Sequence, residues 1–301
     1  MAEIAALVRA LQTEQLPQRE NEPLSRHTTF QIGGPAAVFC LPETPAQLLR
    51  ILELCRACGV RSYLLGNGSN TLFSDAGFDG AVICTVDMKH PVTVRGDRLQ
   101  AAAGAPLAAV CRKAAQAGLA GLEFAFGIPG TVGGAVYMNA GAYGGELKQA
   151  LDSVTFLDQA LELQTLPAAE LGLGYRTSRF ESEGGVILEA EFRLEPGDRQ
   201  DIEGRMRELM ERRREKQPLE LPSAGSTFKR PQGAFAGALI EQAGLRGFAV
   251  GGAAVSTKHC GFVVNTGGAT CADVIALTDE VTRIVHEKTG YRLEREIRVV
   301  E

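Results

Sequence analysis

The chain has 301 residues, of which 45% are hydrophobic and 22% charged, as is typical of a globular protein with a sizeable core. Its formal net charge is −5, which argues against a general nucleic-acid-binding protein. No apolar run approaches the roughly 18 residues of a membrane helix, and charged side chains interrupt the start of the chain, so we expect a cytoplasmic protein without membrane insertion.

The first part of the chain predicts a mixture of helices and strands. One helix has clear ends, because Thr44 can cap it, Pro45 suits its first position and Gly59 can close it. A hairpin turn is expected at Gly96. In chain order we expect a helix over 1–20, a strand over 29–42, a helix over 44–59, strands over 62–66 and 81–86, a hairpin over 92–104 and a helix over 105–118.

The second part alternates with period two and then becomes strongly helical. In chain order we expect strands over 153–158, 162–168 and 185–197, helices over 201–217 and 237–247, a strand over 262–265, a helix over 271–290 and a strand over 291–301. The fold class is therefore α+β. We expect an N-terminal helical segment over 1–28, a region over 29–195 with lobes of about 29–90 and 91–195, and, after the change of character near residues 195–205, a domain over 205–301.

Two glycine-rich loops attract attention, "GNGSNT" (66–71) and "GIPGTVGG" (127–134). Glycines expose backbone N–H groups that can bind anions. Neither loop fits the P-loop pattern or the full dinucleotide fingerprint. The residues leave two interpretations open, tight surface turns or a site for a phosphate-bearing ligand, with polar atoms supplied by Asn67, Ser69, Asn70 and Asn139.

Three further stretches carry candidate polar side chains. In "KQPLELPSAGSTFKRP" (216–231), Ser226 lies near two cations, which fits either a polarised hydroxyl or an ordinary turn serine. In "GYRTSRF" (174–180), two arginines could bind a carboxylate or phosphate, or simply lie on the surface. The run "RRREK" (212–216) fits a solvated helix face or a phosphate site. In "LEREIRVVE", Glu294 and Glu296 share one strand face, which is typical of ordinary exposed positions.

The seven cysteines form no recognisable metal-ligand set. The only C-x-x-C pair, Cys55 and Cys58, lies in the helix expected over 44–59. We therefore expect reduced thiols and no metal.

Taken together, these stretches resemble one family, the UDP-N-acetylenolpyruvoylglucosamine reductases. The resemblance runs from about Thr28 to the C-terminus. It rests on "TTFQIGG", "LLGNGSNTLF", "GIPGTVGGAVYMNAGAYGGE", "YRTSRF", "KQPLELPSAGSTFKRP", "GAAVSTKHCGFVVN" and "LEREIRV". The uninterrupted spacing from Tyr175 to Ser226 is similar to that of the shorter subtype.

The resemblance implies an FAD-binding region of the vanillyl-alcohol-oxidase type over 29–195 and a substrate-binding domain over 205–301, whose last strand returns to the active site. FAD would bind non-covalently, and NADPH would reduce it. The cofactor-binding residues that the resemblance implies are Leu65, Gly66, Asn67, Gly68, Ser69, Asn70, Thr71, Gly127, Ile128, Pro129, Gly130, Thr131, Gly133, Gly134, Asn139, Gly141 and Ala142.

The resemblance also implies the reaction. Reduced FAD would deliver hydride to C3 of the enolpyruvyl group of UDP-N-acetylglucosamine enolpyruvate, and Ser226 would give a proton to C2. Arg176 and Glu296 would stabilise the charge that develops. Implied substrate-binding residues are Tyr175, Lys216, Lys229 and Arg230, the last standing where relatives often have Asn. Two alternatives are a flavin-dependent oxidase of the same fold and a non-catalytic nucleotide-binding module.

Overall fold

The computed structural model describes residues 2–88 and 92–301, and the chain divides into two compact units. The first unit comprises Met1–Arg19, Phe39–Asn67 and Ala81–Arg213, and the second comprises Glu20–Val38, Gly68–Gly80 and Arg214–Glu301. Both units are discontinuous in sequence, unlike the predicted domains, because segments 20–38 and 68–80 pack with the C-terminal part. The predicted boundary between the two lobes, at residues 90 and 91, lies outside the described residues.

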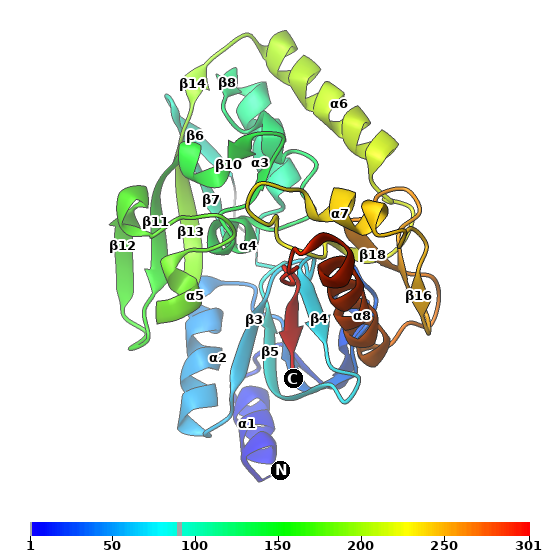
Figure 1. Cartoon of the computed structure of the whole chain (residues 1–301). Helices are drawn as coiled ribbons and strands as arrows, with labels where there is room; N and C mark the ends of the chain where they lie inside the picture. The colour runs from blue at the N-terminus through cyan, green and yellow to red at the C-terminus, as the bar shows by residue number, and fades with distance from the viewer. Residues whose placement is uncertain (1, 89–91) are drawn as a thin grey trace. The chain divides into compact units, whose positions relative to one another are not determined.

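An antiparallel five-stranded sheet forms the centre of the first unit, in the order β12-β11-β13-β7-β6 (Figure 1). Its strands are β6 (Thr93–Arg95), β7 (Arg98–Ala102), β11 (Leu151–Leu157), β12 (Leu163–Pro167) and β13 (Val186–Arg193). The predicted hairpin is confirmed, since β6 pairs with β7 and Gly96 has φ +62°. Apolar side chains of these strands share a core with α3 (Leu107–Gln116). Alternating hydrophobicity therefore predicted this sheet well.

Helix α2 (Pro45–Ala57) of the first unit follows its end signals closely. Thr44 Oγ1 accepts a hydrogen bond from the backbone N–H of Gln47 at 3.2 Å, and Gly59 takes a left-handed φ of +66°. Both features satisfy or close helix ends in the expected way. Strand β3 (Ser62–Leu65) then pairs with β5 (Phe78–Cys84) in parallel.

The shorter elements of the first unit surround this framework. They are β8 (Leu119–Ala120), η2 (Glu123–Ala125), α4 (Val132–Tyr137), β9 (Gly141–Ala142), β10 (Gly145–Glu146), η3 (Leu147–Gln149), η4 (Ala168–Glu170), α5 (Arg179–Glu183), β14 (Glu195–Pro196) and most of α6 (Arg199–Lys216). The end of the loop expected over 127–134 is thus the start of helix α4, and a small hairpin of β9 and β10 follows this helix.

Three predicted elements were too long. The N-terminal helix α1 (Ala2–Thr13) ends early, and β1 (Gln18–Pro23) and η1 (Leu24–Arg26) follow, because Pro17 disfavours helix and Gln15 is left-handed. Strand β2 (Pro35–Cys40) begins later than expected, since Gly33 has φ +136°. The last strand, β19, covers only Arg298–Val300.

The second unit contains a four-stranded sheet in the order β15-β18-β17-β16. Its strands are β15 (Ser223–Ser226), β16 (Ala249–Val250), β17 (Ala253–Val255) and β18 (Phe262–Asn265). The helices α7 (Ala236–Gln242) and α8 (Cys271–Thr289) contribute to the same core, in which Leu277 of α8 is fully buried. At the start of α8, Thr270 forms a capping box that the sequence analysis did not single out. At its end, Gly290 has φ +78°, which agrees with the expected helix end at residue 290.

Segments from the two halves of the sequence also meet in this unit. Strand β19 (red in Figure 1) pairs in parallel with β4 (Thr71–Phe73, cyan). The pairing ties the loop over residues 68–71 to the C-terminal strand. The mixed helices and sheets confirm the predicted α+β class. Over residues 2–88 and 92–301, no helix has both the length and the apolar content needed to span a bilayer.

Candidate functional site

The two glycine-rich loops meet within the first unit. Asn67 Nδ2 donates a hydrogen bond to the carbonyl oxygen of Pro129 at 2.8 Å. A Cβ on Gly66 would lie 2.5 Å from Thr131 Oγ1, so Gly66 is packed directly against the second loop. Segments some sixty residues apart in sequence therefore form one local structure, as a shared ligand would require.

Several glycines of these loops are required because other atoms of the protein lie close to their backbone. A Cβ on Gly133 would approach Ala103 Cβ to 2.9 Å, and one on Gly127 would approach Arg213 Nε to 2.7 Å. Gly68, in the second unit, faces the backbone oxygen of His27, which a Cβ would approach to 2.3 Å. The loops are thus glycine-rich partly because neighbouring protein atoms leave no room for side chains.

The loop over 66–71 has backbone N–H groups of the kind that bind anions. Among the described residues, no acceptor takes the backbone N–H groups of Asn67, Gly68 or Ser69. Consecutive unengaged N–H groups provide partial positive charge for phosphate oxygens. The predicted contacts of the individual cofactor-binding residues stay predictions.

Downstream of α4, the chain forms a hairpin in which Asn139 is central. Strands β9 and β10 pair Gly141 with Glu146 around a turn at Tyr143 and Gly144. The Asn139 side chain is used within the protein: Nδ2 donates to Glu146 Oε2 at 2.9 Å and to the Gly174 oxygen at 2.8 Å, and Oδ1 accepts from the Lys148 N–H at 2.9 Å. Both N–H groups of the Asn139 amide and one acceptor position of its oxygen are therefore occupied by protein atoms.

Glu146, which the sequence did not single out, joins this network. Its carboxylate accepts from Lys148 Nζ at 3.1 Å as well as from Asn139. The Lys148 and Asn139 hydrogen bonds and the positive charge of Arg176 hold the pKa of Glu146 below its ordinary 4.5, although desolvation acts in the opposite direction. The available signal was the E-x-x-Q spacing to Gln149, which forms a capping box.

Arg176 lies in the first unit, in a tight turn that begins at Gly174 and ends at Thr177. The Gly174 N–H donates to the Thr177 oxygen at 3.1 Å. Arg176 itself takes a left-handed φ of +55°, and its Nη2 donates to the Gly141 oxygen at 3.1 Å. The Tyr175 ring lies 5.2 Å from the Arg176 guanidinium carbon and is 49% exposed. Arg176 thus contacts the predicted cofactor residue Gly141, and Tyr175 lies against Arg176.

The side chains of the run over 212–216 lie in different environments. Arg212 pairs with Glu208 on the exposed face of α6, as expected for a solvated helix. Arg213 is buried against Gly127 and lies 5.7 Å from the centre of the Tyr143 ring. Desolvation lowers the pKa of its guanidinium. No local pattern in the sequence distinguishes these adjacent arginines.

Ser226 and Glu296 come together in the second unit. The Glu296 N–H donates to the oxygen of Thr227 at 2.8 Å, and the Lys229 N–H donates to the oxygen of Glu294 at 2.8 Å. A bridge between Phe228 and Arg295 lies between these bonds. Residues 227–229 and 294–296 therefore run as paired backbone segments, and Ser226, which directly precedes the first segment, pairs with Phe262 of β18. Two of the three predicted catalytic residues thus belong to neighbouring segments.

Residues 69 and 70 of the first glycine-rich loop also lie close to Glu296 and Gly225. Asn70 Nδ2 donates to the Glu296 oxygen at 3.2 Å, and the Ser69 oxygen lies 4.0 Å from the position of a Cβ on Gly225. Two predicted cofactor residues are thus neighbours of Glu296 and of the residue preceding Ser226. Of the three predicted catalytic residues, only Arg176 belongs to the other unit.

The other predicted substrate-binding residues of the second unit have protein contacts of their own. Lys229 Nζ forms an ion pair with Glu294 Oε1, and the Glu294 side chain is 71% exposed, as expected for an ordinary exposed position. The Arg230 guanidinium lies 4.5 Å from the centre of the Phe235 ring. Lys216 is the last residue of α6.

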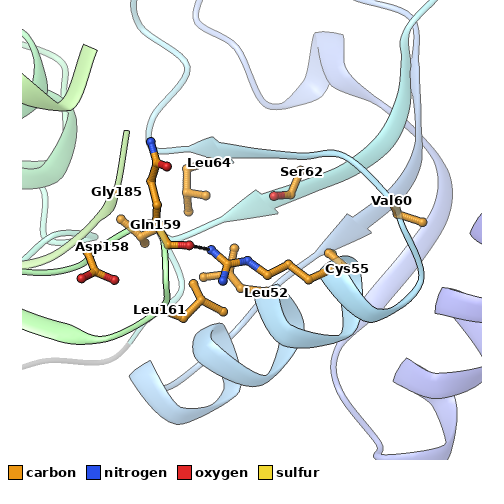
Figure 2. A pocket seen from close by; sticks show the side chains of 11 residues that line it. Leu52, Cys55, Val60, Ser62, Leu64, Asp158, Gln159, Leu161 and Gly185 are labelled. Carbon is orange, nitrogen blue, oxygen red and sulfur yellow. Dashed lines mark hydrogen bonds between the residues drawn. The ribbon is translucent and has the colours of Figure 1, made fainter. Parts of the chain in front are cut away.

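The first unit also contains a cavity of about 380 Å³, away from the predicted site residues. Figure 2 shows Asp158, Gln159 and Leu161 on one side of it and residues of α2 and β3 on the other. None of its lining residues is a predicted site residue. Arg56 donates to the Gln159 oxygen, and Asp158 accepts from backbone N–H groups of its own turn. The cavity therefore does not form part of the candidate site.

Six of the seven cysteines are buried, and all seven are free thiols. Burial raises the pKa of Cys40 and of Cys55 to about 12, which leaves them protonated and unreactive near neutral pH. This agrees with the expectation of reduced, buried thiols.

Comparisons with known proteins agree with the geometry. A family model described as "FAD binding domain" matches residues 35–165, and one described as "UDP-N-acetylenolpyruvoylglucosamine reductase, C-terminal domain" matches residues 217–300. The reductase of Agathobacter rectalis is 48% identical over 303 residues, covering 96% of each chain. That of Clostridium botulinum is 46% identical, covering 93% of this chain and 91% of its own.

A solved structure is similar over almost its full length. It is a UDP-N-acetylenolpyruvylglucosamine reductase from Thermus caldophilus, with 35% identity and a TM-score of 0.79, covering 95% of this chain and 99% of its own. These matches confirm the resemblance, and they agree with the predicted cofactors, FAD and NADPH. The chain belongs to the UDP-N-acetylenolpyruvoylglucosamine reductase family, whose members are FAD-dependent oxidoreductases of peptidoglycan precursor synthesis.

Proposed function

We propose that this chain reduces the enolpyruvyl group of UDP-N-acetylglucosamine enolpyruvate with NADPH, giving UDP-N-acetylmuramate in the cytoplasm. The observation that best supports this is the pairing of residues 227–229 with 294–296, in which Glu296 bonds to Thr227, the residue directly after Ser226. The chemistry that FAD supplies when bound is hydride transfer, from NADPH and then to C3 of the substrate. Both partners are small molecules, and the proposal includes no metal.

Ser226 is the proposed proton donor to C2. A serine hydroxyl is a weak acid, which suits the protonation of a strongly basic carbon. Ser226 ends strand β15 just after Gly225, whose φ of +77° bends the chain there. Proton transfer leaves Ser226 as an alkoxide. Lys229 lies three residues later, and its ammonium group can stabilise this alkoxide once it is released from the ion pair with Glu294.

Arg176 and Glu296 are proposed to stabilise the charge that develops at C2 and on the adjoining carboxylate. The guanidinium of Arg176 would do so by charge-assisted hydrogen bonds, and Glu296 would do so while protonated or sharing a proton. Tyr175, Lys216, Lys229 and Arg230 are proposed to hold the substrate. The lysines and Arg230 carry the positive charge that a diphosphate requires.

The proposal is tested by separating the two half-reactions. In Ser226→Ala, we expect NADPH to reduce the flavin at nearly the normal rate, while reoxidation by the enolpyruvyl substrate slows by about 10²-fold or more, as general acid catalysis predicts. Glu296→Gln should act on the same half-reaction. Ser223→Ala, in the same strand, is the matched control and should leave both rates unchanged. Equal losses in both half-reactions of Ser226→Ala would show that the serine is structural.

A further inference from the structure

The turn that carries Arg176 needs support from outside itself. Arg176 has a left-handed φ of +55°, a conformation that costs free energy in any residue with a Cβ. Within the turn, the Gly174 N–H donates to the Thr177 oxygen at 3.1 Å. Strained backbone of this kind persists only where surrounding contacts fix it.

Three contacts connect this turn to the segment over residues 137–141. Ser178 Oγ donates to the Tyr137 oxygen at 2.7 Å, and Arg176 Nη2 donates to the Gly141 oxygen at 3.1 Å. Between them, Asn139 Nδ2 donates to the Gly174 oxygen at 2.8 Å. Asn139 is the contact that reaches the backbone at the very start of the turn.

Asn139 is itself rigidly held. It is 1% exposed and follows α4 with a φ of +40°, a left-handed position that asparagine tolerates at helix ends. Its Oδ1 accepts from the Lys148 N–H, and its second N–H donates to Glu146. Three of its four hydrogen-bonding positions are therefore filled by hairpin and turn together, so it cannot rotate without breaking several bonds.

We propose that Asn139 is the positioning residue for Arg176: its amide fixes the Gly174 carbonyl and so holds the left-handed turn that presents the guanidinium. The inference rests on the catalytic role proposed for Arg176. It gives Asn139 a purpose other than direct cofactor binding. Glu146 acts beside it, since its carboxylate orients the amide and adds negative charge near Arg176.

The first test measures the turn itself, without substrate. Asn139→Gly keeps the left-handed backbone and removes only the amide. We expect amide hydrogen exchange at Gly174 to accelerate by about tenfold, the loss that one hydrogen bond accounts for, with exchange in β11 and β13 unchanged. Asn21→Gly is the matched control, because Asn21 is also left-handed (φ +53°) but exposed. Unchanged exchange at Gly174 in Asn139→Gly would overturn the proposal.

The second test measures catalysis with the flavin-loaded protein. Asn139→Gly should slow reoxidation by the enolpyruvyl substrate about tenfold, while flavin content and reduction by NADPH stay near normal. In an Arg176→Ala background the same substitution should have no further effect, because its action passes through Arg176. An undiminished effect in that background would overturn the proposal. If Arg176→Ala alone leaves reoxidation intact, the catalytic role of Arg176 fails, while the exchange result still decides whether Asn139 holds the turn.

A third test separates the two hydrogen bonds that the Asn139 amide donates. Asn139→Asp places a carboxylate against the Gly174 oxygen and Glu146, so it should slow reoxidation more than Asn139→Gly does. Adding Glu146→Gln restores a hydrogen bond between the two side chains but not the one to Gly174. We expect the double variant to stay slow, and recovery of the normal rate would show that Glu146, not Gly174, is the partner that matters.

Discussion

The contact between the two glycine-rich loops makes a sharp prediction for Gly66→Ala. The new methyl group would lie 2.5 Å from Thr131 Oγ1, about 0.9 Å inside the 3.4 Å at which ordinary contacts begin. Gly66 has no left-handed φ, so the substitution adds crowding without backbone strain. Thr131 is 3% exposed and its hydroxyl caps α4 by accepting from the Gly134 N–H, so it cannot move away freely.

The expected cost combines two effects. Overpacking of a tight interior costs about 1–3 kcal/mol, and loss of an N-cap costs about 1 kcal/mol. We therefore expect Gly66→Ala to lower the free energy of unfolding by about 2–3 kcal/mol. Urea denaturation of the flavin-free protein, followed by circular dichroism, measures this without a contribution from ligand binding.

A double-mutant cycle provides the refutation. The next nearest atoms to the new methyl group are Thr131 Cγ2 at 3.4 Å and Cβ at 3.5 Å, both ordinary contacts, so in a Thr131→Ala background the cost of Gly66→Ala should fall below about 1 kcal/mol. Gly134→Ala is the control: this glycine is exposed, and its nearest neighbour would be 3.6 Å away, so alanine should be neutral or slightly stabilising. An equal cost in both backgrounds would show that the loops do not touch in this way.

Two other outcomes follow from single side chains. Because folding lowers the pKa of Glu146, its carboxylate stabilises the protein fully above the ordinary pKa of 4.5, and this contribution is lost as the pH falls through the lowered pKa. In urea titrations, the difference in unfolding free energy between wild type and Glu146→Gln should therefore shrink below about pH 4.5. A difference that stays constant with pH would contradict the assignment. Leu277→Ala should destabilise the protein by about 2–5 kcal/mol in the same assay, since Leu277 is fully buried in α8, whereas a cost below about 1 kcal/mol would mean that α8 does not pack as described.

Local signals in the sequence predicted local structure well. The ends of α2 and α8 followed from Thr44, Gly59 and Gly290, because caps and left-handed glycines act over a few residues. The early end of α1 shows the limit of periodicity, since Pro17 and the left-handed Gln15 overrode an amphipathic pattern.

Long-range contacts could not be predicted in the same way. Nothing local to 227–229 indicates that this segment pairs with 294–296, and nothing local to 68–71 indicates that it contacts Glu296. The resemblance to a family supplied Ser226 and Glu296 as site residues, but the contacts between their segments come from the fold. The discontinuous units arise for the same reason.

The glycine-rich stretch shows how one pattern can serve two purposes. Its composition suggested room for a ligand, whereas Gly133 is required by Ala103 and Gly66 by Thr131. Asn139 also looked like a ligand-binding side chain, but its amide is committed to Glu146 and Gly174. Composition alone cannot distinguish close approach by a ligand from close approach by the protein.

The most direct measurement follows the visible absorption of the flavin-loaded protein under anaerobic conditions. NADPH should bleach the flavin band, and UDP-N-acetylglucosamine enolpyruvate added afterwards should restore it while one equivalent of UDP-N-acetylmuramate forms. If the band stays bleached with the enolpyruvyl substrate and returns only when oxygen is admitted, the chain does not reduce this substrate.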